Sequence, residues 1–280
     1  MGFNCGIVGL PNVGKSTLFN ALTETAAAEA ANYPFCTIEP NTGRVAVPDP
    51  RLDALASLAG SATVIPTQLE FVDIAGLVRG ASKGEGLGNQ FLANIRETDA
   101  IAHVLRCFDD SEITHVDGSV DPLRDAGTVE TELMLADIES LERRMAALVK
   151  KTRGGDAEAK RDLALMEKLF AGLSEGVPAR RAEGLSADET RRLPQLQLLS
   201  AKPVLYVCNV AEGDAADGND HTAAVAAYAE QEGAAHVVVS AAIEAEITQL
   251  DSEDKAEFLS ELGLQEAGLA RLIRAGYGLL

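Results

Sequence analysis

One stretch of the sequence has residue types and spacing suited to binding phosphate groups. It reads Gly9-Leu10-Pro11-Asn12-Val13-Gly14-Lys15-Ser16, follows an apolar run and opens a helical pattern, which is the setting that the motif G-x-x-x-x-G-K-[ST] requires. The glycines let the backbone turn so that successive N–H groups point at phosphate oxygens, and the helix N-terminus adds a favourable dipole. We expect Lys15 to reach the β- and γ-phosphates and act in catalysis, and Ser16 to ligate Mg²⁺. Nucleotide contacts are expected from Asn12, Val13, Gly14, Lys15, Ser16 and Thr17.

A second motif predicts that the chain senses the γ-phosphate. Asp73-Ile74-Ala75-Gly76 ends a predicted strand and has the form D-x-x-G. An aspartate at a strand end is commonplace, but together with the phosphate loop it indicates a switch site. Asp73 can hold Mg²⁺ through water, and Gly76 can offer its N–H to the γ-phosphate. Thr37 lies between the two motifs, where its hydroxyl and carbonyl can sense Mg²⁺ and the γ-phosphate, so we count it as a metal ligand and a catalytic residue.

The end of a later strand predicts which base is bound. The GTPase pattern N-K-x-D uses its Asp to accept from guanine N1–H and the 2-amino group, whereas this chain has Asn209-Val210-Ala211-Glu212. Adenine offers neither donor, and Asn209 can still pair with N7 and the 6-amino group. The pattern therefore favours ATP over GTP, with contacts from Asn209, Val210 and Glu212. Ser240, Ala241 and Ala242 follow the next strand and resemble the last base-contacting loop of such proteins.

The residue after D-x-x-G bears on hydrolysis. Many GTPases place a Gln there to orient the attacking water. This chain has Leu77, which cannot hydrogen-bond water, so we expect slow intrinsic turnover or a substitute group. His115, in a polar loop, is a candidate for that role, although a lone loop histidine often only faces solvent. Asn12 is a further clue, because an asparagine at this position can help to seat K⁺.

The surrounding pattern predicts an α/β fold. Short apolar runs alternate with helical patterns, which indicates a mostly parallel sheet covered by helices on both faces, the arrangement of a P-loop NTPase G domain. The expected strands span 3–8, 43–47, 68–74, 100–108, 202–209 and 235–240.

More than ninety residues separate two of these strands, and there the apolar period changes to steps of three and four. One seam comprises Met134, Ile138, Leu141, Met145 and Leu148, and a second comprises Leu163, Met166, Phe170 and Leu173. Gly154-Gly155 lies between them and suits a reversal, so we predict an inserted antiparallel coiled-coil hairpin. Ser186 and Glu189 predict a capping box on a third, short helix. We therefore expect a nucleotide-binding domain over 1–122 and 200–280 and a helical insert over 123–199.

Composition limits the partners. The net charge is −19, so the surface as a whole will not coat nucleic acid. Residues 143–192, however, carry twelve Lys and Arg against eight Asp and Glu. This segment is either a solvated face of mixed charge or a docking patch for RNA or an acidic partner. The four cysteines are widely spaced, and the sequence has neither a signal peptide nor an 18-residue apolar run, so we expect buried thiols, no membrane contact and a cytoplasmic location.

These motifs together resemble the YchF/Obg-like ATPase family. The resemblance rests on residues 9–16, 32–41, 71–77, 83–89, 95–99 and 274–277 and on the Asn209/Glu212 departure, and it covers essentially the whole chain. It implies an ATP-preferring hydrolase with a coiled-coil insert, ribosome association, and a role in translation and stress responses. It also implies that the histidine at position 115 assists hydrolysis. Family members continue into a small β-rich TGS domain, whereas this sequence ends at Leu280.

The sequence is compatible with three functions. The first is an ATP-driven switch whose loops around Thr37 and Gly76 order on binding. The second is an ATP-gated binding module with negligible turnover, which Leu77 favours; a GTP-binding or dual-specificity switch is a variant of the first. The third is a small-molecule kinase, but the D-x-x-G motif, the switch threonine and the base loop argue against it.

Overall fold

The computed structural model describes residues 3–30, 42–74, 87–110, 113 and 118–279. The chain divides into two compact units. The first comprises Met1–Gly76, Thr98–Asp125 and Val204–Leu280, and the second comprises Leu77–Glu97 and Ala126–Pro203. The second unit therefore takes in the described helix Leu87–Glu97, which the sequence-based division at 123 and 199 does not assign to it.

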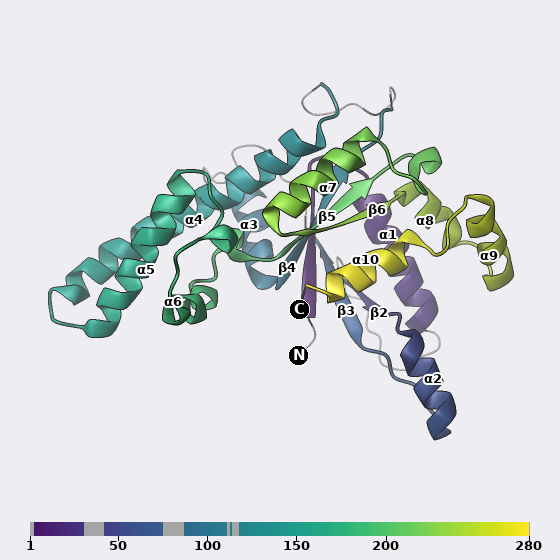
Figure 1. Ribbon diagram of the computed structural model, residues 1–280, viewed down its shortest axis with the longest axis horizontal. Coiled ribbons are helices and arrows are strands. Elements are labelled where there is room, and N and C mark those ends of the chain that lie inside the picture. The colour runs from purple at the N-terminus through teal and green to yellow at the C-terminus, as the bar shows by residue number, and fades with distance from the viewer. Residues whose placement is uncertain (1–2, 31–41, 75–86, 111–112, 114–117, 280) are drawn as a thin grey trace. The chain divides into compact units, whose positions relative to one another are not determined.

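A six-stranded sheet forms the first unit, in the order β2-β3-β1-β4-β5-β6 (Figure 1). All neighbours pair in parallel except β2 and β3, which are antiparallel. The mostly parallel sheet predicted from the sequence is thus confirmed. β4 and β5 are buried along their whole length, as expected for strands covered on both faces. The strands are β1 Phe3–Val8, β2 Thr42–Ala46, β3 Gln68–Asp73, β4 Ala100–Arg106, β5 Val204–Asn209 and β6 Ala235–Val239.

Strand register brings the sequence motifs to one edge of the sheet. Ile7 near the end of β1 is opposite Asp73 of β3, and Arg106 at the end of β4 is opposite Asn209 of β5. Because these strands are parallel, their carboxyl ends and the loops that follow lie along the same edge. Ligands of open α/β sheets bind at this edge.

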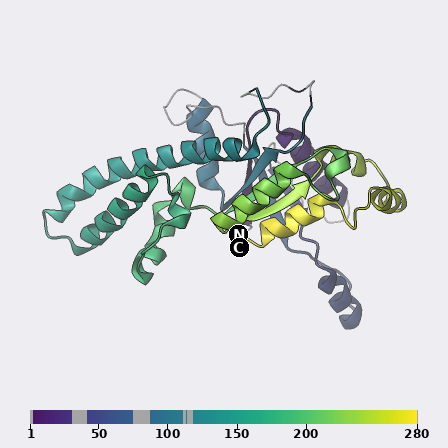
Figure 2. The ribbon, with the colours of Figure 1, turned by 45° about the horizontal axis from the view of Figure 1, so that its top comes forward.

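Helices pack on the sheet within the first unit. α1 contacts β1, β2 and β3, whereas α7 and α10 lie beside each other over β5 and β6 (Figures 1 and 2). The apolar face of α10, Leu269, Leu272 and Ile273, is buried. α8 is joined to α10 by the buried carboxylate of Glu244, whose Oε1 accepts from the Gly268 N–H at 2.6 Å. The helices are α1 Lys15–Ala30, α2 Pro50–Ala59, α7 Asp220–Glu232, α8 Ala241–Ile247, α9 Ser252–Glu261 and α10 Gly268–Tyr277.

The second unit is helical, and its centre is the predicted hairpin. Most of α4 (Pro122–Thr152) lies antiparallel beside α5 (Ala157–Ser174), and the turn between them has Gly155 at φ 85° (Figures 1 and 2). The capping box is confirmed on α6 (Ala187–Arg192), where Ser186 and Glu189 bond reciprocally. The unit also contains α3 (Leu87–Glu97), η2 (Ala179–Arg181), η3 (Leu193–Leu196) and η4 (Leu199–Ala201).

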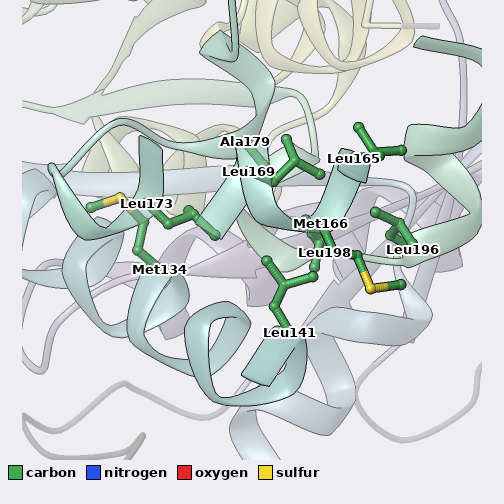
Figure 3. Close-up of a cluster of buried hydrophobic side chains, with 9 residues drawn as sticks. All are labelled: Met134, Leu141, Leu165, Met166, Leu169, Leu173, Ala179, Leu196 and Leu198. Atoms are coloured by element: carbon green, nitrogen blue, oxygen red, sulfur yellow. The ribbon is translucent and has the colours of Figure 1, made fainter. Parts of the chain in front are cut away.

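The buried face of α5 differs from the predicted seam. Figure 3 shows Met134 and Leu141 of α4 packed with a cluster of α5 side chains, which comprises Leu165, Met166, Leu169 and Leu173. Leu163 is only half-buried and is not in this cluster, so its assignment to the seam was wrong. The reason is a third wall: Ala179, Leu196 and Leu198 also pack here, which widens the apolar stripe beyond a strict two-helix seam.

A buried carboxylate on α4 binds the segment at η4. Asp137 of α4 is 1% exposed and accepts bonds from the N–H groups of Leu199 and Ser200 and from the Ser200 hydroxyl. Burial raises the pKa of Asp137, and these hydrogen bonds oppose that rise. The bonds satisfy the buried charge and tie α4 to η4.

Three of the four cysteines lie among the described residues. Cys5, Cys107 and Cys208 are free, buried thiols, as predicted, and Cys36 lies outside the described residues. Among the helices that the structure describes, none is long and apolar enough to cross a bilayer.

Candidate functional site

The phosphate loop has a backbone that its sequence explains. Asn12 and Gly14 adopt left-handed conformations with φ of 64° and 88°, a region that asparagine tolerates and glycine enters freely. A Cβ on Gly14 would overlap Nδ2 of Asn209, and a Cβ on Gly9 would lie 2.8 Å from the carbonyl oxygen of Val104. Both glycines are therefore required by close approach, and α1 begins directly after the loop at Lys15.

Asn209 joins the phosphate loop to the start of α8, on the side of the site where the sequence predicts contacts to the base. Its Nδ2 donates to the Val13 carbonyl at 2.9 Å, and its Oδ1 accepts from the Ala241 N–H at 2.9 Å. The side chain is 5% exposed. Asn209 thus holds three chain segments together, and among the described residues its second Nδ2 hydrogen has no acceptor. The predicted pairing with adenine N7 and the 6-amino group stays a prediction.

A cavity of about 740 Å³ lies beside this link. Eight of the residues predicted to bind nucleotide line it: Asn12, Gly14, Thr17, Asn209, Val210, Glu212, Ala241 and Ala242. Glu212 opens the short helix η5 (Glu212–Asp214) and is exposed, so its carboxylate is accessible to a ligand. The cavity has the size of a small-molecule site.

A second cavity, of about 570 Å³, shares Asn12, Gly14 and Thr17 with the first. Lys15, Ser16 and Asp73 also line it. The ammonium of Lys15 pairs with the Asp73 carboxylate, and the two side chains are 10% and 20% exposed. The predicted phosphate-binding lysine and metal-binding aspartate are therefore in contact.

The donor set of this second cavity suits Mg²⁺. Ser16 supplies a hydroxyl and Asp73 a carboxylate, and Mg²⁺ prefers a few such oxygen ligands together with waters and phosphate oxygens. The ion pair with Lys15 shows that the Asp73 carboxylate can hold a cation at this position.

Some predicted residues do not line either cavity. Val13 is 1% exposed and contributes its main-chain carbonyl to Asn209. Ser240 is 2% exposed and its hydroxyl oxygen is buried, so its side chain is not accessible to a ligand in this structure. The predicted residues Thr37, Gly76, Leu77 and His115 lie outside the described residues.

The larger of the two cavities, called the base-side cavity from here on, has one wall that the sequence did not predict. Phe108, Asp109, Asp110 and Ile113 follow β4 and line the base-side cavity. A signal was available, because β4 was predicted and loops after parallel strands form ligand sites. The segment has no phosphate or base motif, however, so its residue types alone did not single it out.

The phosphate loop opens a helix, a strand-end aspartate lies beside it, and Asn209 links the loop to the start of α8. These features define a P-loop nucleotide-binding protein of the GTPase class. Residues 4–142 match the family model described as 50S ribosome-binding GTPase. The chain is 58% identical over 280 residues to the ribosome-binding ATPase YchF of Haemophilus influenzae, and 51% identical over 282 residues to that of Bacillus subtilis. Each alignment covers 100% of this chain and 76% of the relative.

A solved structure agrees with these relatives. The YchF GTPase of Schizosaccharomyces pombe superposes with a TM-score of 0.87 at 38% identity, covering 100% of this chain and 76% of that one. The chain belongs to the YchF family.

Proposed function

We propose that this chain is an ATP-binding and ATP-hydrolysing switch protein that works with the ribosome in translation or stress regulation. The observation that carries the base preference is the position of Val210 and Glu212. Both line the base-side cavity at the positions where a guanine-binding site has Lys and Asp. Relatives named ribosome-binding ATPase support the same choice. The S. pombe relative is described as a GTPase, so the base preference has to be measured on this chain.

Mg²⁺ and the phosphate loop would each bind phosphate oxygens, in different ways. Bound Mg²⁺ would neutralise charge on the phosphate oxygens, with Ser16, Asp73 and Thr37 as its protein ligands. Lys15 is held by Asp73 in this structure, and nucleotide binding would draw its ammonium to the β- and γ-phosphates. The main-chain N–H groups at the start of α1 would orient the same oxygens.

We propose slow intrinsic turnover. Leu77 supplies no group that could orient water, and His115 is the proposed substitute, with Asn12 helping to seat K⁺. Asn12 lines both cavities, which supports a K⁺ site near the phosphates. If His115→Ala leaves the turnover rate unchanged, the role of His115 is lost while ATP binding stands.

The proposed partner is the ribosome, because relatives are named ribosome-binding ATPases. A ribosomal partner supports a cytoplasmic location. Within the second unit, several basic residues form ion pairs: Lys168 with Glu189, Arg180 with Glu130, and Arg192 with Asp162. Other exposed cations, which have no ion pair among the described residues, gather at the hairpin tip, namely Lys150, Lys151, Arg153, Lys160 and Arg161. We propose this tip as the site of RNA contact.

The deciding experiment is the affinity of the purified chain for ATP and for GTP, measured by calorimetry with Mg²⁺. We expect ATP to bind several-fold more tightly. The double variant Val210→Lys, Glu212→Asp restores the guanine pattern and should move the ratio toward GTP, whereas the exposed Glu230→Asp on α7 should not. Equal affinities in the wild type would overturn the base assignment.

The second candidate function is an ATP-gated binding module with negligible turnover. Kinetic measurements distinguish it from the hydrolysing switch. Phosphate release is measured with and without ribosomes. Stimulation by ribosomes supports the switch, and no turnover under either condition supports the module.

A further inference from the structure

Arg106 is the largest side chain buried in the core of the described residues. It ends β4 and is 1% exposed, although its guanidinium is charged. The described residues place no carboxylate in ion-pair range of it. Its three nitrogens instead donate to main-chain carbonyls, Nε to Phe108 at 3.1 Å, Nη1 to Ile113 at 3.0 Å and Nη2 to Asp110 at 3.1 Å.

These bonds explain why the residue is an arginine. A buried charge is costly unless its hydrogen bonds are satisfied, and bonds from a charged donor are stronger than neutral ones. A planar guanidinium donates from three separate nitrogens in fixed directions, whereas a lysine donates from a single nitrogen. The ring of Phe108 adds a contact, with its centroid 4.7 Å from Cζ of Arg106.

The carbonyls that Arg106 binds belong to residues of the cavity wall. Phe108, Asp110 and Ile113 all line the base-side cavity together with Glu212. The described part of this wall contains no helix or strand that would hold it through its own backbone bonds. At its start, Cys107 is tied to β5 through a bond from its N–H to the Asn209 carbonyl at 2.8 Å. Beyond Cys107, the side chain of Arg106 links the wall to the sheet.

We propose that Arg106 is a positioning residue for the nucleobase: it holds the wall residues Phe108, Asp110 and Ile113 so that the aromatic face of Phe108 packs against the base. This proposal rests on the proposed nucleotide-binding function and names which part of the ligand the wall recognises. The triphosphate is bound by the phosphate loop and needs nothing from the wall. Loss of Arg106 should therefore weaken binding of a nucleotide but not of inorganic tripolyphosphate.

The test compares the affinities of ATP and Mg²⁺-tripolyphosphate for the full chain by calorimetry. Arg106→Gln should weaken ATP binding about tenfold, the loss expected when one base-stacking face is displaced, and leave tripolyphosphate affinity within about twofold. Arg106→Lys keeps the charge but cannot reach three carbonyls, so it should also lose ATP affinity. Arg271→Gln is the matched control, because Arg271 also donates to a main-chain carbonyl, that of Val238, away from this cavity.

Phe108→Ala keeps the test valid where the Arg106 variants do not fold, because Phe108 is only half-buried and its removal leaves no buried charge behind. It should show the same selective loss of ATP affinity. Equal losses for ATP and tripolyphosphate, unchanged ATP affinity in a folded Arg106→Gln, or full retention by Arg106→Lys would each overturn the proposal. If the wild type binds neither ligand, the proposed nucleotide-binding function is overturned as well. If the wild type binds both ligands and the variants behave as just described, only the proposed role of Arg106 is overturned.

Discussion

The side chain of Asn209 donates a hydrogen bond to the main-chain carbonyl of Val13, 196 residues earlier in the chain. The same side chain accepts from the Ala241 N–H, so one buried amide connects the phosphate loop, the end of β5 and the start of α8. Gly14 makes this possible, because any Cβ at that position would overlap Nδ2 of Asn209. The phosphate loop and the predicted base-binding segments therefore depend on the same side chain.

Asn209→Asp should weaken ATP binding by at least about tenfold. The variant keeps an acceptor for Ala241 but replaces the donor to Val13 with a charged oxygen, and an unmade buried hydrogen bond costs about 1–3 kcal/mol. Calorimetry with ATP and with tripolyphosphate should show losses for both ligands, because the phosphate loop itself is released. The exposed Asn20→Asp on α1 is the control. Unchanged tripolyphosphate affinity would show that Asn209 acts on the base side alone.

Asp73→Asn should change the dependence of ATP binding on Mg²⁺. In the wild type, the Asp73 carboxylate pairs with Lys15, and it is also a proposed Mg²⁺ ligand. Without Mg²⁺, the variant should bind ATP at least as tightly as the wild type, because Lys15 is no longer held by a carboxylate. With Mg²⁺, the wild type should gain affinity and the variant should gain much less. A Mg²⁺ titration at fixed ATP measures both, and an identical Mg²⁺ response in the two proteins would remove Asp73 from the metal site.

Charge reversal at the hairpin tip should weaken RNA or ribosome binding. Lys150 and Lys151 lie in the last turn of α4 and are exposed, so the double change to Glu removes two cations proposed to bind phosphate without breaking an ion pair among the described residues. The slope of log affinity against log salt should become shallower by about one for each lysine that binds a phosphate in the wild type. Co-sedimentation with ribosomes over a salt series measures this slope. Lys255→Glu on α9 is the control, and an effect equal to that of the control would dismiss the patch.

Glu244 should make stability depend on pH. Burial raises the pKa of this carboxyl, and the bonds from Gly268 and Leu269 only partly oppose the rise. The folded state therefore binds a proton more tightly than the unfolded state, so this group lowers stability as pH rises from the ordinary glutamate range toward its raised pKa. Glu244→Gln lacks that dependence, and its melting temperature relative to wild type should increase as pH rises from about 4 to about 8. A difference that stays constant across this range would show that Glu244 does not titrate with a raised pKa.

The sequence by itself determined the parts of the site whose chemistry is local. A phosphate loop needs consecutive N–H groups and a lysine from one short segment, so residues 9–16 could be assigned without knowing their neighbours. Apolar periodicity likewise predicted the strands of the described sheet and the hairpin, because burial of one face leaves its period in the sequence. Glu212 in place of Asp predicts the preferred base on similarly local grounds, since it alters one side chain in a known pattern.

Only the tertiary structure decided how these segments support one another. The pairing of Lys15 with Asp73, the link from Asn209 to Val13 and the wall held by Arg106 all join residues through the strand order of the sheet. The buried face of α5 moved from Leu163 to Leu165 because η3 and the segment before η4 pack on it as a third wall. The apolar pattern of one segment indicates that a residue is buried, but not which distant segment packs on it. The packing of the whole unit determines that partner.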